Sequence, residues 1–375
     1  MILSETQIAI RDTVRAFAQD RIRPLSERFE RDGGFAPWVF ESLADLGLLG
    51  MLAPEEFGGA ASDYVSYALA LIEIAAADGA LSTIVSIQNS IMVAGLLKDG
   101  TDAQKARFLP DLIAGKVIGA FALTETDAGS DASAIRTKAT KVEGGWVLDG
   151  AKQFITSGKI AGLAIVIAVT APAAGKRGLT AFLVPTDRNG YVVEKVEHKL
   201  GQGASDTCAL RFEKLFVEDH LVLGPVGHGY RIALSNLETG RIGIAAQCIG
   251  MAQAALEIAV AYAKDRRSMG KPIIEHQAVG FRLADLATRL EAARQLVLSA
   301  ASLRDADQPA LTRASMAKVF ASETAEAVVS GAIQTLGGYG YLEEFGVAKL
   351  YRDVRVCQIY EGTSDIQRMV IARAL

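Results

Sequence analysis

The residue that most clearly could do chemistry is Glu361. In the segment RVCQIYEGTSDIQR, Arg355 to Arg368, its carboxylate follows an apolar run and directly precedes a Gly-Thr-Ser break. Acidic side chains favour helix starts, where the helix dipole stabilises negative charge. The glycine would stop one helix, and Thr363 or Ser364 would cap the next, with Gln367 completing a capping box to Ser364. Glu361 is therefore predicted to lie at a fixed corner between two helices.

The neighbours Ile359 and Tyr360 indicate a partly dry setting for this carboxylate. Loss of water raises the pKa of a carboxyl group and makes the carboxylate a stronger base. Such a base could remove a proton from a substrate carbon. The residues alone are equally compatible with a surface glutamate at a helix end, so both interpretations stay open.

Two further segments suit a flat ligand. In KQFITSG, Lys152 to Gly158, a strand would point Phe154 and Thr156 to the same face, and a ring beside a hydroxyl fits a planar heterocycle. FALTETDAGSDAS, Phe121 to Ser133, would present hydroxyl and backbone N–H groups to a ligand. A strand edge with one core aromatic explains the first segment at least as well, and an ordinary loop explains the second equally well.

A pair of glycines, Gly337 and Gly338 in QTLGGYGYLEEFG, would end a helix and let another group approach the backbone closely. Familiar catalytic motifs are absent from the sequence. There is no GxGxxG after a strand, no GxxxxGK[ST], no HExxH and no GxSxG. The four histidines are scattered, so no metal site is expected.

Composition narrows the class of protein. The chain has 375 residues, 50% of them hydrophobic and 22% charged, which is enough for two or three domains. The net charge is −4, with bases and acids mixed, so no nucleic-acid partner is expected. The three cysteines are far apart, and we expect each to be a small buried hydrophobe.

No membrane partner is expected. The amphipathic start MILSETQIAIRDTVRAF lacks the pattern of a signal peptide. The longest uncharged apolar segment that we identify, AGLAIVIAVTAPAAG from Ala161, is shorter than the roughly 20 residues that cross a bilayer. A cytoplasmic location in a reducing compartment is our expectation.

Three blocks follow one another along the chain. Residues 1–116 repeat apolar side chains at helical spacing, 117–222 hold short runs rich in Val, Ile, Thr and Phe, and 223–375 return to long helical patterns. The expected fold class is α+β and mainly helical. It comprises an N-terminal helical domain, a middle antiparallel β domain in the form of a barrel or sandwich, and a C-terminal helix bundle.

Taken together, the segments resemble one known family. TETDAGSD, KQFITSG, ETGRIGIAA, DRRSMGKPIIEHQA, QTLGGYGYL and RDVRVCQIYEGTSDIQR look like signatures of the acyl-CoA dehydrogenases, in that family's order and spacing. The resemblance covers essentially the whole chain and implies a four-helix bundle at its C-terminal end. The joint pattern is specific, although no single segment would be.

The resemblance implies a reaction of short or short-branched acyl-CoA. Glu361 matches the catalytic base of short- and medium-chain members, which removes the α-proton while the β-hydrogen leaves as hydride to FAD, giving a trans-2-enoyl-CoA. The thioester carbonyl would accept hydrogen bonds from the flavin ribityl hydroxyl and from the backbone N–H of Glu361. Electrons would pass to an electron-transferring flavoprotein, in fatty acid or amino acid catabolism. The chain would form a homotetramer.

Site residues are implied by the same matching. Arg266, whose charge suits a pyrophosphate, would contact FAD across a subunit interface. The residues implied to bind FAD are Phe121, Leu123, Thr124, Ser130, Phe154, Thr156, Arg266, Ser268, Gln277, Gln334, Gly337, Gly338, Thr363 and Asp365. The residues implied to meet the substrate are Ser130, Glu238, Arg241, Tyr360 and Gly362.

Some positions depart from the family pattern. Gln202-Gly203 lacks the Arg that is common there, and Thr126-Asp127 replaces a frequent Pro-Gly. Gly240 stands where isovaleryl-CoA and long-chain members carry their base, which leaves Glu361 as the carboxylate candidate. Other CoA-thioester chemistry stays an alternative, namely an aromatic or dicarboxylic acyl-CoA dehydrogenase or a flavin-dependent desulfinase. A flavin-binding protein without dehydrogenase activity is a third, against which the acidic composition argues.

Overall fold

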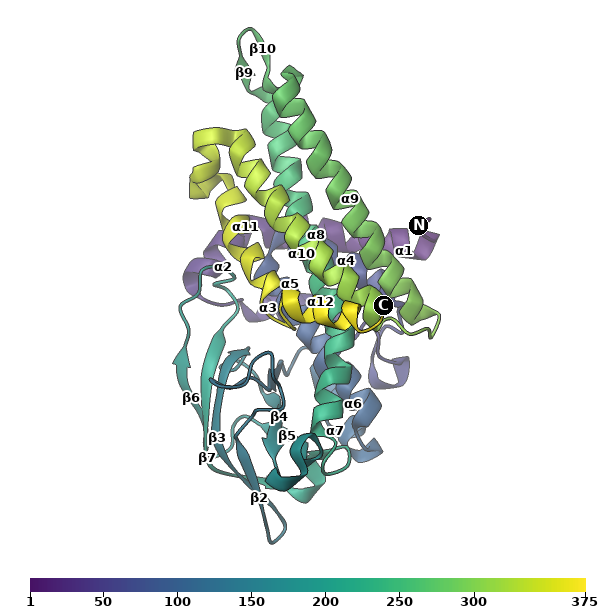
Figure 1. The fold of residues 1–375 in the computed structure, drawn as a ribbon, viewed down its shortest axis with the longest axis vertical. Coiled ribbons are helices and arrows are strands. Elements are labelled where there is room, and N and C mark those ends of the chain that lie inside the picture. The colour runs from purple at the N-terminus through teal and green to yellow at the C-terminus, as the bar shows by residue number, and fades with distance from the viewer.

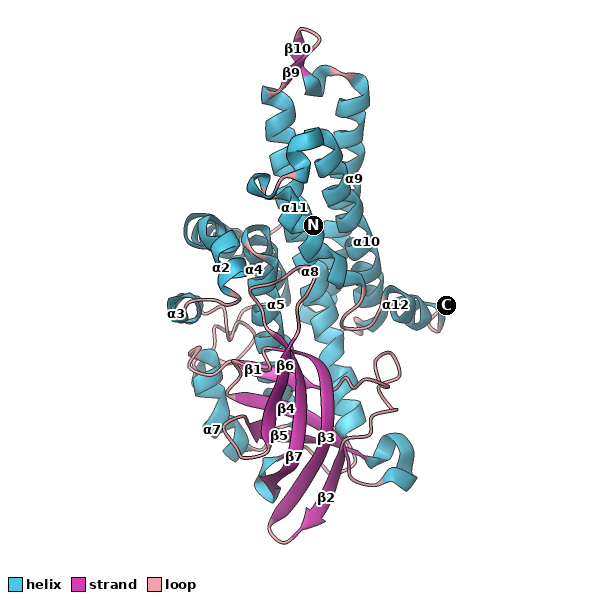
Figure 2. Ribbon diagram, turned by 90° about the vertical axis from the view of Figure 1, so that its left-hand side faces the viewer, coloured by secondary structure: helices cyan, strands magenta, loops and turns pink.

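A sheet domain lies at one end of an elongated molecule, with helices packed against one side of it (Figures 1 and 2). In the computed structural model, which describes residues 1–375, three long C-terminal helices rise away from a β domain, and the N-terminal helices pack beside them (Figure 1). One core cluster of 56 buried residues joins the N-terminal helices to the bundle, and a second of 39 residues fills the β domain and the helices against it. The protein is mainly helical, as predicted.

The N-terminal block is helical throughout. Its α-helices are α1 (Glu5–Phe17), α2 (Ser26–Asp32), α3 (Pro37–Asp45), α4 (Tyr64–Ala77), α5 (Gly79–Ile87), α6 (Ala94–Asp99) and α7 (Asp102–Ile113). Helix α7 begins with a capping box, in which Thr101 Oγ1 accepts from the N–H of Gln104 at 3.2 Å. Helices α4 and α5 are buried almost completely, which makes them the wall against which the bundle packs.

Two helical segments are long and apolar enough to cross a membrane by length and composition, Gly79–Asp99 and Gly229–Asp265. The segment Gly79–Asp99 contains a longer uncharged run than the segment from Ala161, so the prediction that the Ala161 segment is the longest was wrong. The Ala161 segment contains a β-strand. Inside the protein, 89% and 67% of the two apolar windows are buried. Core helices pass the same test, so these segments are weak evidence for a span.

The middle block is one curved sheet (Figure 2). Its order is β6-β7-β3-β2-β4-β5-β8, and β1 pairs with β4. The strands are β1 (Gly119–Ala122), β2 (Lys138–Val142), β3 (Gly145–Thr156), β4 (Leu163–Val169), β5 (Leu179–Pro185), β6 (Tyr191–Val196), β7 (Thr207–Glu218) and β8 (Val222–Leu223). Both β1 and β2 pair with β4 in parallel, so the sheet is mixed rather than purely antiparallel. Strands β2 and β3 form a hairpin, with Val142 opposite Gly145 and Gly144 at φ +73°.

The C-terminal block is built on α8 (Gly229–Asp265), α9 (Gln277–Asp305) and α10 (Leu311–Leu336), followed by α11 (Val347–Val354) and α12 (Ser364–Ala372). Buried alanines line the contacts among the long helices, which lets their backbones approach closely. A short hairpin of β9 (Arg267–Ser268) and β10 (Lys271–Pro272) caps the far end of α8. All three cysteines are buried and free, as predicted.

Candidate active site

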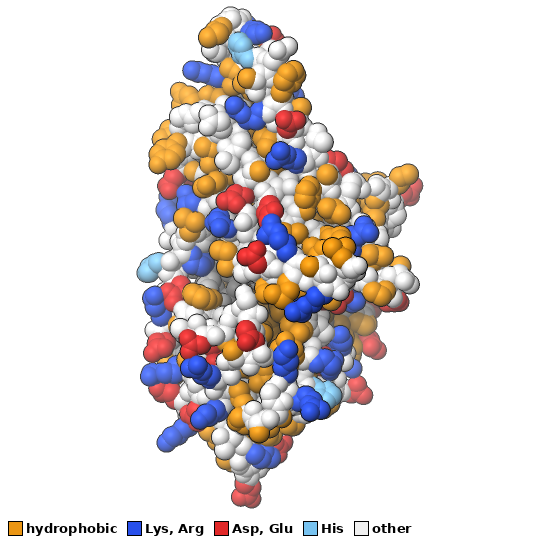
Figure 3. Space-filling view, viewed as in Figure 1, with side chains coloured by type: hydrophobic (Ala, Val, Ile, Leu, Met, Phe, Trp, Pro, Cys, Tyr) orange, Lys and Arg blue, Asp and Glu red, His pale blue; other side chains and the backbone are white.

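The candidate site is a cleft where the three blocks meet. Its volume is about 190 Å³, and hydrophobic side chains gather around the hollow between the bundle and the β domain (Figure 3). The lining residues include Thr83 and Ile87 of α5, Phe121 of β1, Leu123, Thr124 and Ser130 after β1, Phe154 and Thr156 of β3, Arg241 of α8, and Tyr360, Glu361 and Gly362. The cleft therefore joins segments that lie hundreds of residues apart in the chain.

Glu361 faces this cleft from the predicted corner. The residue adopts φ +51° and the next glycine φ +87°, so the chain turns sharply between Gln358 and the start of α12. The carboxylate is half-buried, and its Oε2 atom is buried without a hydrogen-bond partner. Burial raises the pKa of Glu361 to about 7, although the charges of Lys318 and Arg241 oppose the increase.

Space for the carboxylate depends on Gly240. A Cβ atom at this position of α8 would lie 2.0 Å from Oε2 of Glu361, closer than any real contact. A larger residue at position 240, including a second carboxylate, therefore cannot be accommodated while the Glu361 side chain keeps this position.

The cap of α12 is one of the two residues predicted, but the predicted capping box is not formed. Thr363 is the N-cap and accepts from the N–H of Ile366 at 3.3 Å, so the predicted capping box between Ser364 and Gln367 is wrong. Because the cap falls one residue earlier, Gln367 lies outside the box position. Its Nε2 instead donates to the carbonyl oxygens of Glu361, at 3.2 Å, and Gly362, at 2.9 Å. Gln367 thus braces the corner that carries the base.

A wall suited to a flat ligand lies on the β-domain side. Phe154 is 64% exposed and adopts φ +58°, at an irregularity in the pairing of β3 with β7 between Lys152 and Ile155. Simple strand alternation therefore does not hold there, yet Phe154 and Thr156 both line the cleft. An exposed ring beside hydroxyls fits the isoalloxazine of FAD.

A buried ion pair holds the loop of this wall. Lys152 is fully buried, and its Nζ donates to Oε1 of Glu125 at 2.8 Å and to the carbonyl oxygen of Leu123 at 3.0 Å. The carboxylate also accepts from the N–H groups of Arg136, at 2.6 Å, and Thr137, at 3.0 Å. This pair was not among the predicted site residues. The sequence signal for it is a lysine within the predicted strand KQFITSG, because a charge that the fold buries needs a partner.

The remaining predicted cofactor residues lie elsewhere. Arg266, Gly337 and Gly338 line a second cleft of about 440 Å³ at the far end of the bundle, with Tyr262 and Tyr339. Ser268 and Gln277 follow on β9 and at the start of α9, and Gln334 lies in the last turn of α10. At 1.5 Å per residue, Arg266 is about 39 Å along α8 from Gly240. Within one chain, the FAD residues predicted at the first cleft and those predicted at the second cleft are therefore farther apart than a dinucleotide is long.

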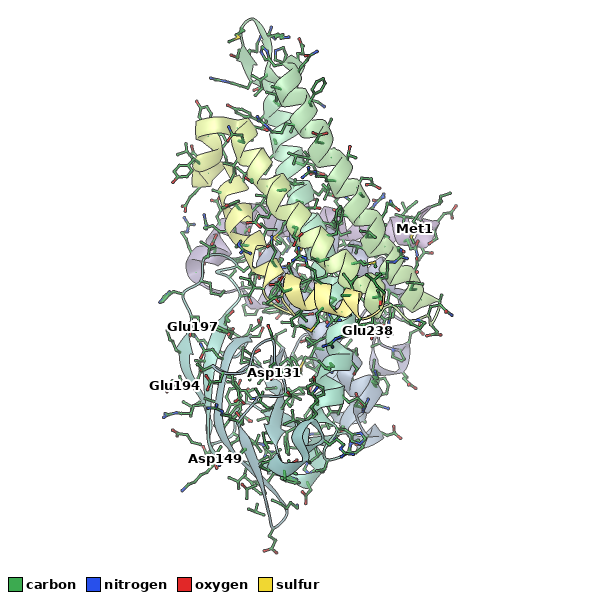
Figure 4. The ribbon with its side chains drawn as sticks, in the orientation of Figure 1. Met1, Asp131, Asp149, Glu194, Glu197 and Glu238 are labelled. Atoms are coloured by element: carbon green, nitrogen blue, oxygen red, sulfur yellow. The ribbon has the colours of Figure 1, made fainter.

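The substrate residues divide as well. Ser130, Arg241, Tyr360 and Gly362 line the first cleft. Glu238 lies near α12 and forms an ion pair with Arg304 at 3.9 Å, outside the lining (Figure 4). Among the cofactor residues, Thr363 caps α12, and Asp365 is exposed and contacts Arg368.

A hydrogen-bonded cluster behind the cleft was missed by the sequence analysis. The hydroxyl of Tyr360 donates to Oε1 of Gln247 at 2.6 Å, and Gln247 Nε2 donates to Oγ1 of Thr83 at 2.7 Å. Thr83 in turn donates to Oε1 of Gln202 at 2.8 Å. These four residues come from α5, α8 and two segments outside the helices and strands, and single polar residues give no sequence signal of meeting one another, so only the tertiary structure reveals the cluster.

The three-block fold thus brings one half-buried carboxylate, Glu361, into the same cleft as the exposed ring of Phe154. Three family models match in chain order: the acyl-CoA dehydrogenase N-terminal domain over residues 4–116, the middle domain over 120–215 and the C-terminal domain over 227–375. The chain therefore belongs to the acyl-CoA dehydrogenase family, whose members are FAD-containing oxidoreductases acting on CH–CH bonds.

Three relatives match nearly the whole chain. An acyl-CoA dehydrogenase of Bacillus subtilis is 44% identical over 100% of this chain and 99% of its own length. The mitochondrial short-chain specific acyl-CoA dehydrogenase of Bos taurus is 42% identical over 99% of this chain and 90% of its own. A 3-(aryl)acrylate reductase of Clostridium sporogenes is 40% identical over 100% of both.

Solved structures agree with the fold. Butyryl-CoA dehydrogenase of Megasphaera elsdenii has a TM-score of 0.97 and 38% identity, covering 100% of this chain and 99% of its own. A chain in the structure reported for the electron transferring flavoprotein of Acidaminococcus fermentans has a TM-score of 0.98 and 38% identity, covering 100% and 98%.

Proposed function

We propose that this protein oxidises a short or short-branched acyl-CoA to the trans-2-enoyl-CoA, with Glu361 as the base. One observation carries the proposal: a half-buried carboxylate with a buried, unpartnered oxygen faces the cleft, and its pKa is raised to about 7. A carboxylate in this state can hold the proton of a weakly acidic carbon near neutral pH.

The proton comes from the carbon beside the thioester carbonyl. As it leaves, negative charge develops on the thioester oxygen and needs hydrogen-bond donors. The backbone N–H of Glu361 donates to no other group of the chain, so it is free to serve this oxygen. FAD, when bound against Phe154 and Thr156, supplies the two-electron acceptor. The apolar lining excludes water, which keeps the carboxylate basic.

Preference for short chains is supported by the end of the cleft. Thr83 and Tyr360 line it, and Gln247 and Gln202 lie buried directly behind them in the hydrogen-bonded cluster. A long acyl chain would have to displace these bonds and leave buried polar groups unpaired. The short-chain specific and butyryl-CoA relatives support the same choice.

A panel of CoA esters tests the proposal. Butyryl-CoA or a short-branched ester added without oxygen should bleach the flavin band, and octanoyl-CoA should do so weakly. Gln247→Ala, which opens the end of the cleft, should improve octanoyl-CoA relative to butyryl-CoA. The panel includes an arylpropionyl-CoA, because one relative is a 3-(aryl)acrylate reductase. Bleaching by this ester but not by butyryl-CoA would favour aromatic substrates. No bleaching by any ester would overturn the proposal.

We further propose a homotetramer in the cytoplasm that passes electrons to an electron-transferring flavoprotein. Large apolar side chains are exposed at the far end of the bundle, with Met269 at 92%, Tyr341 at 85% and Phe281 at 64%. Burial against a second copy would remove them from water. The separation between the two clefts supports a cofactor site completed by another chain. The neighbour reported under the electron transferring flavoprotein supports the choice of acceptor.

A further inference from the structure

The corner that carries Glu361 is conformationally costly. Glu361 and Gly362 are consecutive residues with positive φ, a region that a glutamate rarely adopts. Neither residue lies in a helix or strand, so regular secondary structure does not hold them. Contacts from other elements must therefore keep the corner in place.

Lys318 makes one of these contacts. This residue of α10 is completely buried, and its Nζ donates to the carbonyl oxygen of Gly362 at 2.7 Å. Lys318 has no salt-bridge partner, and its hydrogen bond is to a neutral carbonyl group. Burial without an ion pair is expensive for a lysine, so a simple structural role is poorly served by this residue type.

Gln367 makes the matching neutral contact. It is also fully buried, and its Nε2 donates to the same carbonyl oxygen at 2.9 Å. The two donors therefore share one acceptor, one with a full charge and the other without. The neutral amide of Gln367 is sufficient to donate a hydrogen bond to the Gly362 carbonyl. The positive charge of Lys318 therefore needs a separate explanation.

We propose that Lys318 is a positioning residue with two tasks: it holds the Glu361 corner through the Gly362 carbonyl, and its charge favours the ionised carboxylate of the base. This inference rests on the proposed function of Glu361. Lys318 is not itself one of the residues that line the cleft, and its hydrogen bond to the site is to the carbonyl oxygen of Gly362, so it acts through the corner that carries Glu361.

The charged and titratable groups around Glu361 come from three helices. Lys318 faces it from α10, Arg241 from α8, and the buried hydroxyl of Tyr67 from α4. Burial raises the pKa of Glu361, and Lys318 followed by Arg241 lowers it. Burial also lowers the pKa of Lys318, which the nearby Cys248, Cys357 and Glu361 oppose. Arg241 donates to Ser315 at 3.4 Å and leaves its Nε unpartnered, so both cations are incompletely paired.

The experiment compares Lys318→Met with Gln367→Met in the FAD-loaded protein. The rate of flavin bleaching by butyryl-CoA is measured from pH 5.5 to 9. Both variants should slow bleaching, because both loosen the corner. Lys318→Met should also move the pH midpoint upward by about one unit, since a nearby positive charge is lost. Gln367→Met should leave the midpoint where the wild type has it.

A second readout separates this inference from the reaction itself. The carboxyl band of Glu361, identified by infrared difference against Glu361→Gln, can be titrated without substrate. The same upward shift in Lys318→Met is expected there. If Lys318→Met does not retain flavin or its melting temperature, Lys318→Gln, which keeps a donor without the charge, should show the shift. An unchanged midpoint in the neutral variant, or equal shifts in the Lys318 and Gln367 variants, would overturn the inference. A wild type that no acyl-CoA bleaches would contradict only the proposed function.

Discussion

Two glutamates near the cleft place the same carboxyl group in opposite environments. Glu125, on the β-domain side, is half-buried, and Lys152 with two backbone N–H groups holds its carboxylate. Burial alone would raise its pKa, but the lysine and these hydrogen bonds lower it below the usual value. Glu361, on the bundle side, has an unpartnered oxygen and a pKa raised to about 7.

The difference in environment distinguishes a carboxylate with a structural role from one suited to proton transfer. A carboxylate with every lone pair satisfied is stable as an anion and is a poor base. A carboxylate that is partly dry and incompletely paired binds protons near neutral pH, which suits proton transfer. The loop beside the flat-ligand wall is thus held by the first glutamate, and the substrate would be attacked by the second.

The largest effect is expected from Glu361→Gln. Loss of the base should reduce the rate of flavin bleaching by butyryl-CoA about 10⁴-fold, while flavin and ligand are retained. Stopped-flow absorbance measures the rate. Glu125→Gln is the matched control, and it should change stability far more than the pH midpoint of bleaching. A near-normal rate in Glu361→Gln would mean that another group is the base.

Lys152→Met tests the structural role proposed for the Glu125 carboxylate. It leaves Glu125 buried without its cation, so the free energy of unfolding should fall by about 3 to 5 kcal/mol. Urea unfolding measures the change, with flavin retention as a second reading. Lys141→Met, which breaks the exposed pair with Asp219, is the control and should cost less than about 1 kcal/mol. Equal losses in the two variants would contradict the account.

Gly240→Ala probes the space around the base. Its Cβ would lie 2.0 Å from Oε2 of Glu361, so the carboxylate must move. A displacement of this size should slow flavin bleaching about 10²-fold. Gly331→Ala on α10 is a suitable control, because the new methyl meets only the flexible end of Leu286. An unchanged rate in Gly240→Ala would show that the position of Glu361 is not critical.

The smallest expected effect concerns pH and stability. The folded pKa of Glu361 is about 7 against 4.5 for the ordinary group, so the folded protein binds more protons between these values and loses stability as pH rises through them. Glu361→Gln does not titrate. Its advantage in unfolding free energy over the wild type should therefore grow by about 1 to 3 kcal/mol from pH 4.5 to pH 8. A constant difference across this range, read by denaturant unfolding at fixed FAD, would exclude the raised pKa.

Local signals allowed much of this site to be predicted from sequence. The apolar run, the glycine and the hydroxyls after Glu361 predict a corner without any knowledge of the fold, and the structure confirms it. Glycine pairs, helix caps and the hairpin at Gly144 were predictable for the same reason, because each depends on a few neighbouring residues.

Features that depend on distant segments were not predictable. The parallel pairing of β1 with β4, the buried pair of Lys152 with Glu125 and the cluster of Tyr360 with Gln247 each join residues far apart in the chain. The sequence left both Thr363 and Ser364 open as the cap of α12, because the two residues have similar intrinsic preferences and only the backbone angles of the corner decide between them.

Helix α8 runs unbroken from the substrate cleft to the hairpin at the far end of the molecule. If the two predicted cofactor groups serve one FAD, each holo site is shared by neighbouring copies, and cofactor affinity is linked by mass action to assembly. Dilution should then release flavin and dissociate the assembly over the same range of protein concentration.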